Sequence, residues 1–176
     1  MKNLNVALWL IGGAAVLWAL SKYTTTGASI LQTITDAGVN MIAQFEGFSA
    51  TAYNDPPGST KYSIGYGHQI QPGEPYMNQT ITVDQGRALL AQDTANAQIA
   101  VRGAITRTIT PSQFDALTSF VYNVGAHAFT SGTVPAKVNA GDFAAVAATM
   151  RLYNKSGGAV NPSLTARRET EAASFA

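Results

Sequence analysis

The 176-residue chain contains no cysteine. It therefore cannot form a disulfide framework, a thiol nucleophile or a thiolate metal site. Charge is also scarce: charged residues make up 12% of the chain, and 11 Lys and Arg stand against 10 Asp and Glu. A net charge of +1 gives no overall attraction to nucleic acid, so we expect no nucleic-acid partner. A chain of this length with 46% hydrophobic residues predicts one globular domain with a short extension.

The N-terminal part of the chain is almost free of charge. Before Asp36 the only charged side chains are Lys2 and Lys22, and residues 3–21 between them form an uncharged run. As a helix, this run would reach about 28 Å, close to the thickness of the hydrocarbon core of a bilayer. Three interpretations are open: a retained membrane segment, a signal peptide cleaved near Ala19-Leu20-Ser21, and a helix buried in the protein or packed in a virion. The length favours the first, which makes the lipid bilayer an expected partner of residues 3–21.

The composition then divides the chain into three parts. We expect residues 1–22 to be a transmembrane or signal-anchor segment with an apolar helix. Residues 23–33 are polar, small and rich in Thr and Gly, which predicts a linker. The folded domain is predicted over residues 34–176.

The periodicity of this domain predicts an α+β architecture. A helix is expected from Thr35 or Asp36 to about Glu46, followed over residues 48–70 by a small antiparallel sheet. Helical patterns then return, with Thr and Gln spaced as capping boxes at Thr82 and Thr110. Further helices are predicted at residues 114–123, 135–139, 142–151 and 162–175. This order gives a small antiparallel β-sheet lobe and a larger helical lobe, preceded by the N-terminal apolar helix.

Glu46 and Asp55 are candidate catalytic carboxylates. Glu46 ends a helix with an apolar face, where a partly shielded carboxyl group would hold its proton more tightly. Asp55 lies nine positions later at a turn rich in Pro and Gly, where solvent would keep it ionised. Two carboxylates in contrasting environments are the minimum equipment of a glycosidase. Their spacing alone does not separate them from solvated surface groups.

The sequence around Glu46 and Asp55 is more specific than their spacing. The segment E-G-F-S-A-T-A-Y-N-D at residues 46–55, followed by Y-S-I-G-Y-G-H at residues 62–68, resembles the active-site signature of the phage lysozyme family, glycoside hydrolase family 24. Residues 114–125, 151–154 and 164–171 are similar to further blocks of that family, so the resemblance runs from about residue 36 to 175. It implies a lysozyme-like α+β fold and cleavage of peptidoglycan between N-acetylmuramic acid and N-acetylglucosamine with inversion, without a metal or organic cofactor.

The resemblance also implies a role for each site residue. Glu46 would protonate the leaving oxygen, and Asp55 would activate a water together with a hydroxyl residue that stands directly before I-G-x-G-H. The family has Thr there, whereas this chain has Ser63, and the interval from Asp55 is two residues longer. The turn at residues 56–59 is the natural place for that insertion. We therefore expect Ser63 as the third catalytic residue and keep Thr60 as the alternative.

Four further positions are candidates for substrate binding. Asn123 and Asn154 are similar to sugar-facing positions in the family, His68 could line the cleft, and Tyr66 of the sheet could stack on a sugar ring. Each also has a structural interpretation, because an aromatic residue commonly packs in the core, a histidine at a strand end commonly fixes a hairpin, and an asparagine near a helix end commonly caps it.

The last helix contains two adjacent arginines. Arg167 or Arg168 is placed to pair with Glu46 or with a carboxylate of the substrate. The alternative is a pair within the same helix, for which Glu171 is well spaced.

Two other functions stay open. The chain could be a catalytically silent peptidoglycan-binding or virion structural protein, since a fold does not guarantee activity. It could also be a lytic transglycosylase, although the retained Asp55 argues against a reaction that needs no activated water. For the enzyme we expect action in phage release or entry, from the host inner membrane and periplasm or from a virion membrane. Residues 3–21 would then be either a releasable tether or a permanent anchor.

Overall fold

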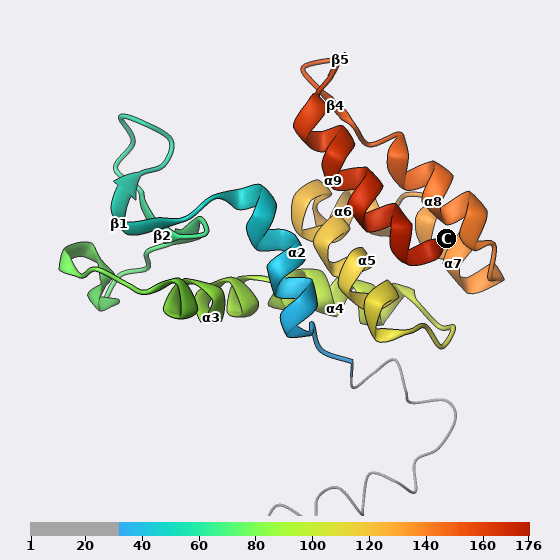
Figure 1. Cartoon of the computed structure of the whole chain (residues 1–176), viewed down its shortest axis with the longest axis horizontal. Coiled ribbons are helices and arrows are strands. Elements are labelled where there is room, and N and C mark those ends of the chain that lie inside the picture. Colours follow the sequence, from blue (N-terminus) through green and yellow to red (C-terminus); the bar gives the residue numbers. More distant parts are fainter. Residues whose placement is uncertain (1–31) are drawn as a thin grey trace, which may run out of the picture.

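The computed structural model of the protein describes residues 32–176. The expected membrane segment and almost all of the expected linker lie outside these residues. None of the helices described is long and apolar enough to cross a membrane. Figure 1 shows a small sheet at one end of the molecule and a group of helices at the other, with α2 and α3 leading from one to the other.

The first lobe contains the larger sheet and the segment that follows it. Its elements are β1 (Ser49–Asn54), β2 (Tyr62–Gly65), β3 (His68–Gln69), the 3-10 helix η1 (Pro75–Asn78) and α3 (Val83–Asp93). The strands lie in the order β1-β2-β3, and both pairs are antiparallel. The small antiparallel sheet predicted over residues 48–70 is therefore confirmed.

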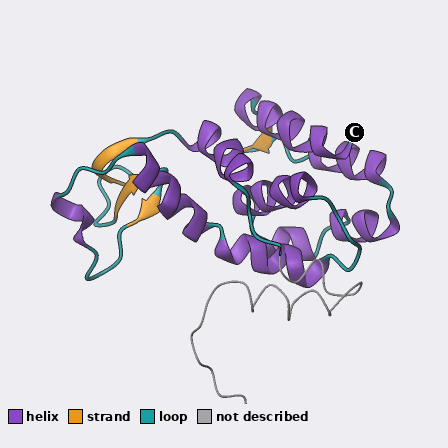
Figure 2. Ribbon diagram, turned by 60° about the horizontal axis from the view of Figure 1, so that its bottom comes forward, coloured by secondary structure: helices purple, strands orange, loops and turns teal. Residues whose placement is uncertain are grey.

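The second lobe is helical, apart from one short hairpin that Figure 2 shows among the helices. Its elements are α2 (Asp36–Glu46), α4 (Ala95–Ala104), α5 (Pro111–Val124), α6 (Ala126–Thr130), α7 (Val134–Ala140), α8 (Phe143–Arg151), β4 (Lys155–Ser156), β5 (Ala159–Val160), α9 (Pro162–Ala172) and the 3-10 helix η2 (Ala173–Phe175). Together the two lobes confirm the α+β prediction.

Helix α2 begins where the sequence predicts and is fixed there to α5. The Thr35 hydroxyl caps the helix by accepting a hydrogen bond from the Gly38 amide at 3.2 Å. The amide of Thr35 donates to Asp115 of α5 at 2.9 Å, and its hydroxyl donates to the same carboxylate. A β-carbon on Gly38 would lie only 2.5 Å from Asp115 Cγ, so the glycine permits this close approach. The position of Glu46 is thus set by a helix that is fixed at its first turn.

The other helix starts depend on local hydrogen bonding. The capping boxes at Thr82 with Gln85 and at Thr110 with Gln113 are both present, as predicted. The structure also contains α6 and the β4–β5 hairpin, which the periodicity does not predict. A helix of five residues completes little more than one turn, and each hairpin strand has two residues, so neither is long enough to show a period.

The hydrophobic core consists of separate clusters in different parts of the fold. The largest buried cluster lies in the helical lobe, where Phe114, Leu117 and Phe120 of α5 are fully buried. A smaller cluster joins α2 to α3 through Ile42 and Leu90. Helix α5 therefore forms the centre of the helical lobe, and α2 packs against both α5 and α3.

Candidate active site

Glu46 is the last residue of α2, and the chain turns away from the helix at Gly47, whose φ of 72° is in the region that favours glycine. The Glu46 side chain is 27% exposed, and its Oε1 accepts a hydrogen bond of 2.6 Å from an Arg167 Nη atom. A pocket of about 240 Å³ opens beside it. The pocket is lined by Glu46, Gly47, Phe48, Ser49, Tyr53 and Gly65.

Asp55 and Ser63 meet through the register of the first two strands. Tyr53 of β1 is opposite Ser63 of β2, and Asp55 closes the ladder by donating its amide to the Lys61 carbonyl at 3.1 Å. Asp55 and Ser63 are therefore diagonal neighbours on one face of the hairpin. The buried Ser63 hydroxyl donates to Asp55 Oδ2 at 3.1 Å. The turn at residues 56–59 lies beyond this ladder and does not separate the two side chains.

The charge of Glu46 acts on two tyrosines, Tyr53 and Tyr122, and the charge of Asp55 acts on the first of them. Burial raises the pKa of Tyr53, and the negative charges of Asp55 and Glu46 raise it further. Burial, followed by the charges of Glu46 and Asp93, raises the pKa of Tyr122 on α5 to about 12. Both phenols are thus neutral at physiological pH. The charges of Glu46 and Asp55 thus both act on Tyr53, which lines the Glu46 pocket.

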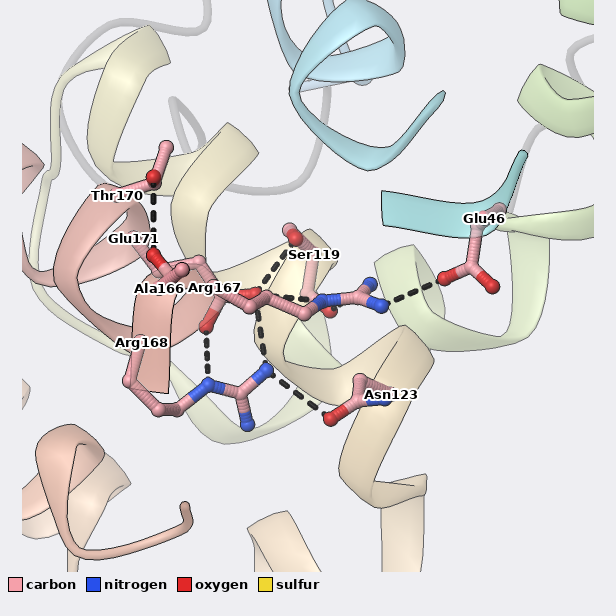
Figure 3. A network of polar contacts seen from close by, with 8 residues as sticks. All are labelled: Glu46, Ser119, Asn123, Ala166, Arg167, Arg168, Thr170 and Glu171. Atoms are coloured by element: carbon pink, nitrogen blue, oxygen red, sulfur yellow. Dashed lines mark hydrogen bonds and ion pairs between the residues drawn. The ribbon is translucent and has the colours of Figure 1, made fainter. Parts of the chain in front are cut away.

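Arg167 reaches this site from α9, and Figure 3 shows its side chain extending toward Glu46. Its Nε donates to Glu171 Oε1 at 3.2 Å, one Nη donates to Glu46 and the other donates to the Ser119 carbonyl at 3.2 Å. The guanidinium also lies 5.5 Å from the centre of the Phe45 ring. Each guanidinium nitrogen therefore has an acceptor. The sequence offered Glu46 and Glu171 as alternative partners, and the structure shows that Arg167 pairs with both.

Glu171 lies at the centre of the buried charges. Its Oε1 accepts hydrogen bonds from Arg167, from Arg168 at 3.2 Å and from the Ser119 hydroxyl at 2.6 Å. Arg168 Nε lies 2.8 Å from Glu171 Oε2, an ion pair that is not aligned as a hydrogen bond. Arg168 also donates to the Asn123 side-chain oxygen at 3.0 Å. Glu171 was predicted only as a partner within its own helix, because the charged face of α9 is the buried one and hydrophobic periodicity cannot find it. Ser119 of α5 was missed as a contributor to the site.

His68 is held between two acidic side chains. Its Nδ1 lies 2.9 Å from Asp93 Oδ1, and its Nε2 lies 3.0 Å from Glu74 Oε2. Burial alone would lower the pKa of His68, but the hydrogen bonds and charges of Asp93 and Glu74 together raise it above its ordinary value. Tyr66 is buried beside Phe48, with ring centres 5.3 Å apart. Both residues have the contacts expected of their structural interpretation.

The remaining candidates lie apart from the Glu46 pocket. Thr60 is exposed and lines a different pocket with Lys61 and Gln69. Asn123 lines a pocket of about 540 Å³ near β4. Asn154 precedes that strand, and its carbonyl accepts a backbone hydrogen bond from Asn161. The structure therefore brings Ser63 to Asp55 and does not bring Thr60 there. Across residues 32–176, no group of three or more histidine, aspartate or glutamate side chains is placed to hold a metal ion.

Comparison with known proteins gives a consistent result. Residues 43–171 match the family described as Phage lysozyme. The chain is 41% identical over 142 residues to an endolysin of Bacillus phage PZA, covering 81% of this chain and 54% of that protein. It is 33% identical over 158 residues to a SAR-endolysin of Bacteriophage PS119, covering 89% of each. Its structure is similar to that of an endolysin from Escherichia coli O157:H7 phage FAHEc1, with a TM-score of 0.71, 32% identity and coverage of 82% of this chain and 94% of that one.

The lengths of these proteins differ. The chain spans about half the length of the endolysins of Bacillus phages PZA and B103. The matches to those two proteins cover about four fifths of this chain.

Proposed function

Because this chain belongs to the phage lysozyme family, we propose that it is a muramidase that hydrolyses the β-1,4 bond between N-acetylmuramic acid and N-acetylglucosamine in peptidoglycan. The observation that carries the proposal is the hydrogen bond from Ser63 to Asp55 on the hairpin that also forms a wall of the Glu46 pocket. Glycoside hydrolysis needs an acid and a second carboxylate that assists a water. We assign the catalytic domain to residues 34–176.

The proposed mechanism divides the work between the two carboxylates. Glu46, at the end of a fixed helix and partly shielded from water, protonates the glycosidic oxygen as the bond breaks. Asp55 accepts a proton from the attacking water, and the Ser63 hydroxyl fixes the orientation of the Asp55 carboxylate. The ionised Asp55 also stabilises the positive charge that develops on the sugar ring. These steps use only side chains of the chain itself.

The assignment of Glu46 is tested by the variant Glu46→Gln, which keeps the size of the side chain and removes its acid. We expect clearing of permeabilised cells or purified peptidoglycan to fall by at least about 100-fold, the usual contribution of general acid catalysis. Glu169→Gln is the matched control, because Glu169 is 55% exposed and pairs with Arg151 on the surface. Activity of Glu46→Gln equal to that of the parent would falsify the assignment. An inactive parent would favour a catalytically silent binding protein.

The stereochemistry is a separate part of the proposal. A water activated by Asp55 on the face opposite the leaving group gives inversion at the anomeric carbon. The first product released from a defined glycan is therefore expected as the α-anomer, which proton NMR detects before mutarotation. A β-anomer contradicts inversion. An anhydro-sugar end group in the mass spectrum identifies a transglycosylase instead.

We also propose that residues 3–21 bring the enzyme to the bilayer. Support comes from their length, from the lysines at both ends and from the similarity to a protein named SAR-endolysin. With Lys2 on the cytoplasmic side, the catalytic domain would lie in the periplasm, where peptidoglycan is found. Cell fractionation before and after collapse of the membrane potential separates a releasable tether from a permanent anchor. A mature chain beginning at Lys22 would show cleavage and exclude both.

A further inference from the structure

The proposed acid lies against a positive charge. An Arg167 Nη atom is 2.6 Å from Glu46 Oε1, and the Arg167 side chain is only 4% exposed, so water screens this charge little. An unshared guanidinium at this distance favours the ionised form of the carboxylate. A general acid must instead carry a proton when the substrate binds. A second carboxylate bound to Arg167 would limit the hold of its charge on Glu46.

The buried carboxylate of Glu171 has the geometry for this task. It is fully buried and accepts from the Nε of the same guanidinium that donates to Glu46. The Ser119 hydroxyl and Arg168 fix its orientation from two other sides. Among residues 32–176, the hydrogen bonds and ion pairs of these two groups do not include Glu46. Arg167 thus bridges two carboxylates, and only one of them is at the pocket (Figure 3).

We propose that Glu171 is a positioning residue of the active site, which shares the charge of Arg167 with Glu46 and so allows Glu46 to hold its proton at the pH of catalysis. This inference rests on the proposed function, because it assigns Glu171 a role through the proposed acid. Without the Glu171 charge, Glu46 becomes the only anionic partner of Arg167. The guanidinium then stabilises the Glu46 carboxylate more strongly, and the acid is lost at lower pH.

Other titratable groups around Glu46 do not provide this balance. Tyr53 of β1 and Tyr122 of α5 face Glu46 and stay neutral, because burial raises the pKa of both. Asp55 acts on Tyr53 from the hairpin, and Asp93 of α3 acts on Tyr122. Among Asp55, Asp93 and Glu171, only Glu171 binds the Arg167 guanidinium that donates to Glu46.

The direct test is Glu171→Gln in the full chain. The pH at which activity falls to half on the alkaline side is expected to decrease by about one unit, the size of the interaction between partly buried charges separated by one guanidinium. Carbon-13 NMR of side-chain-labelled glutamate follows the Glu46 carboxyl directly, and its titration midpoint is expected to decrease by the same amount. Glu169→Gln is the matched control on α9: it removes one exposed carboxylate and is expected to leave both midpoints in place.

Removing Glu171 alone leaves Arg168 without its carboxylate in the interior and can prevent folding. The comparison of Arg168→Gln with Arg168→Gln/Glu171→Gln avoids this problem. Each of these variants keeps an anionic partner for every buried arginine, and they differ only at residue 171. The double variant is expected to show the lower midpoint.

The outcomes separate the two proposals. A decrease of both midpoints in the variants without Glu171 supports the inference, and an unchanged or increased Glu46 midpoint overturns it. Since the NMR titration needs no substrate, it decides the role of Glu171 even in a parent that does not cleave peptidoglycan. An inactive parent, or an active Glu46→Gln variant, overturns the proposed function and leaves the measured charge sharing as a structural property.

Discussion

A single methyl group added at Gly86 is expected to act on the Glu46 pocket from the side of α3. A β-carbon there would lie 2.7 Å from Cε2 of the Phe48 ring and 3.5 Å from the Gly65 backbone. The second distance is an ordinary contact, whereas the first requires the ring to move. Phe48 is 38% exposed and lines the pocket with Glu46, so its ring can move outward only by changing the pocket wall.

The free energy of unfolding combines two opposing terms. Alanine is about 1 kcal/mol more favourable than glycine inside a helix. Overpacking commonly costs about 1–3 kcal/mol. Gly86→Ala is therefore expected to be between neutral and about 2 kcal/mol less stable than the parent, with a Tm lower by up to about 8 °C for a domain of this size.

The matched control is Gly103→Ala on α4, where an added β-carbon meets no atom within 4 Å. This variant keeps the helical gain alone, so its Tm is expected to rise by about 2–4 °C. Its activity is expected to equal that of the parent, because the Gly103 site does not line the Glu46 pocket.

Thermal unfolding followed by circular dichroism measures the stability of both variants, and the rate of clearing of purified peptidoglycan measures their activity. Displacement of a pocket wall by a fraction of an ångström is expected to reduce kcat/KM of Gly86→Ala by about tenfold. A Gly86→Ala variant that is as stable as Gly103→Ala and as active as the parent would refute the reasoning. Such a result would mean that the Phe48 ring moves freely at this contact.

Three further predictions follow from single contacts. The pKa of His68 is raised in the folded protein, so the stability that protonated His68 contributes is fully present below about pH 6.5 and is lost as the pH rises through the folded-state pKa. Chemical denaturation should therefore show His68→Asn strongly destabilised at pH 5.5 and much less so at pH 9. Ser63→Ala removes the hydroxyl that holds Asp55 and should reduce kcat about tenfold or more, whereas Ser63→Thr should retain a larger share of it, and equal rates for the two would exclude the hydroxyl from catalysis. Thr110→Ala removes the cap of α5 and should lower the free energy of unfolding by about 1 kcal/mol without changing kcat, as measured by urea denaturation and clearing assays.

The parts of the fold that local chemistry decides could be predicted from the sequence. The starts of α3 and α5 follow from a threonine and a glutamine three residues apart, whose hydrogen bonds form within one turn of helix. The β1–β2 hairpin follows from alternation and from a turn rich in proline and glycine. In contrast, α6 is set by its packing against α4 and α5, which a run of five residues cannot reveal.

The residues of the candidate site also differ in how far the sequence could predict them. Glu46, Asp55 and Ser63 lie within 18 consecutive residues and could be proposed from motif and phase. The Arg167 contact with Glu46 joins residues 121 positions apart, and the sequence could only offer it as one of two options. The burial of Glu171 was not predictable, because a helix face of Arg, Arg and Glu looks like a solvated one until its partners are known.

The turn between β1 and β2 has a consequence for how this protein can vary. The ladder from Tyr53 to Asp55 is completed before the turn begins, and Ser59 and Lys61 close the turn with their own hydrogen bonds. Extra residues accepted there would lengthen an exposed loop without altering the phase of the strands that position Asp55 and Ser63. The turn is therefore a tolerant position for evolutionary insertion, and for grafting a wall-binding peptide in the design of lytic enzymes with a chosen bacterial target.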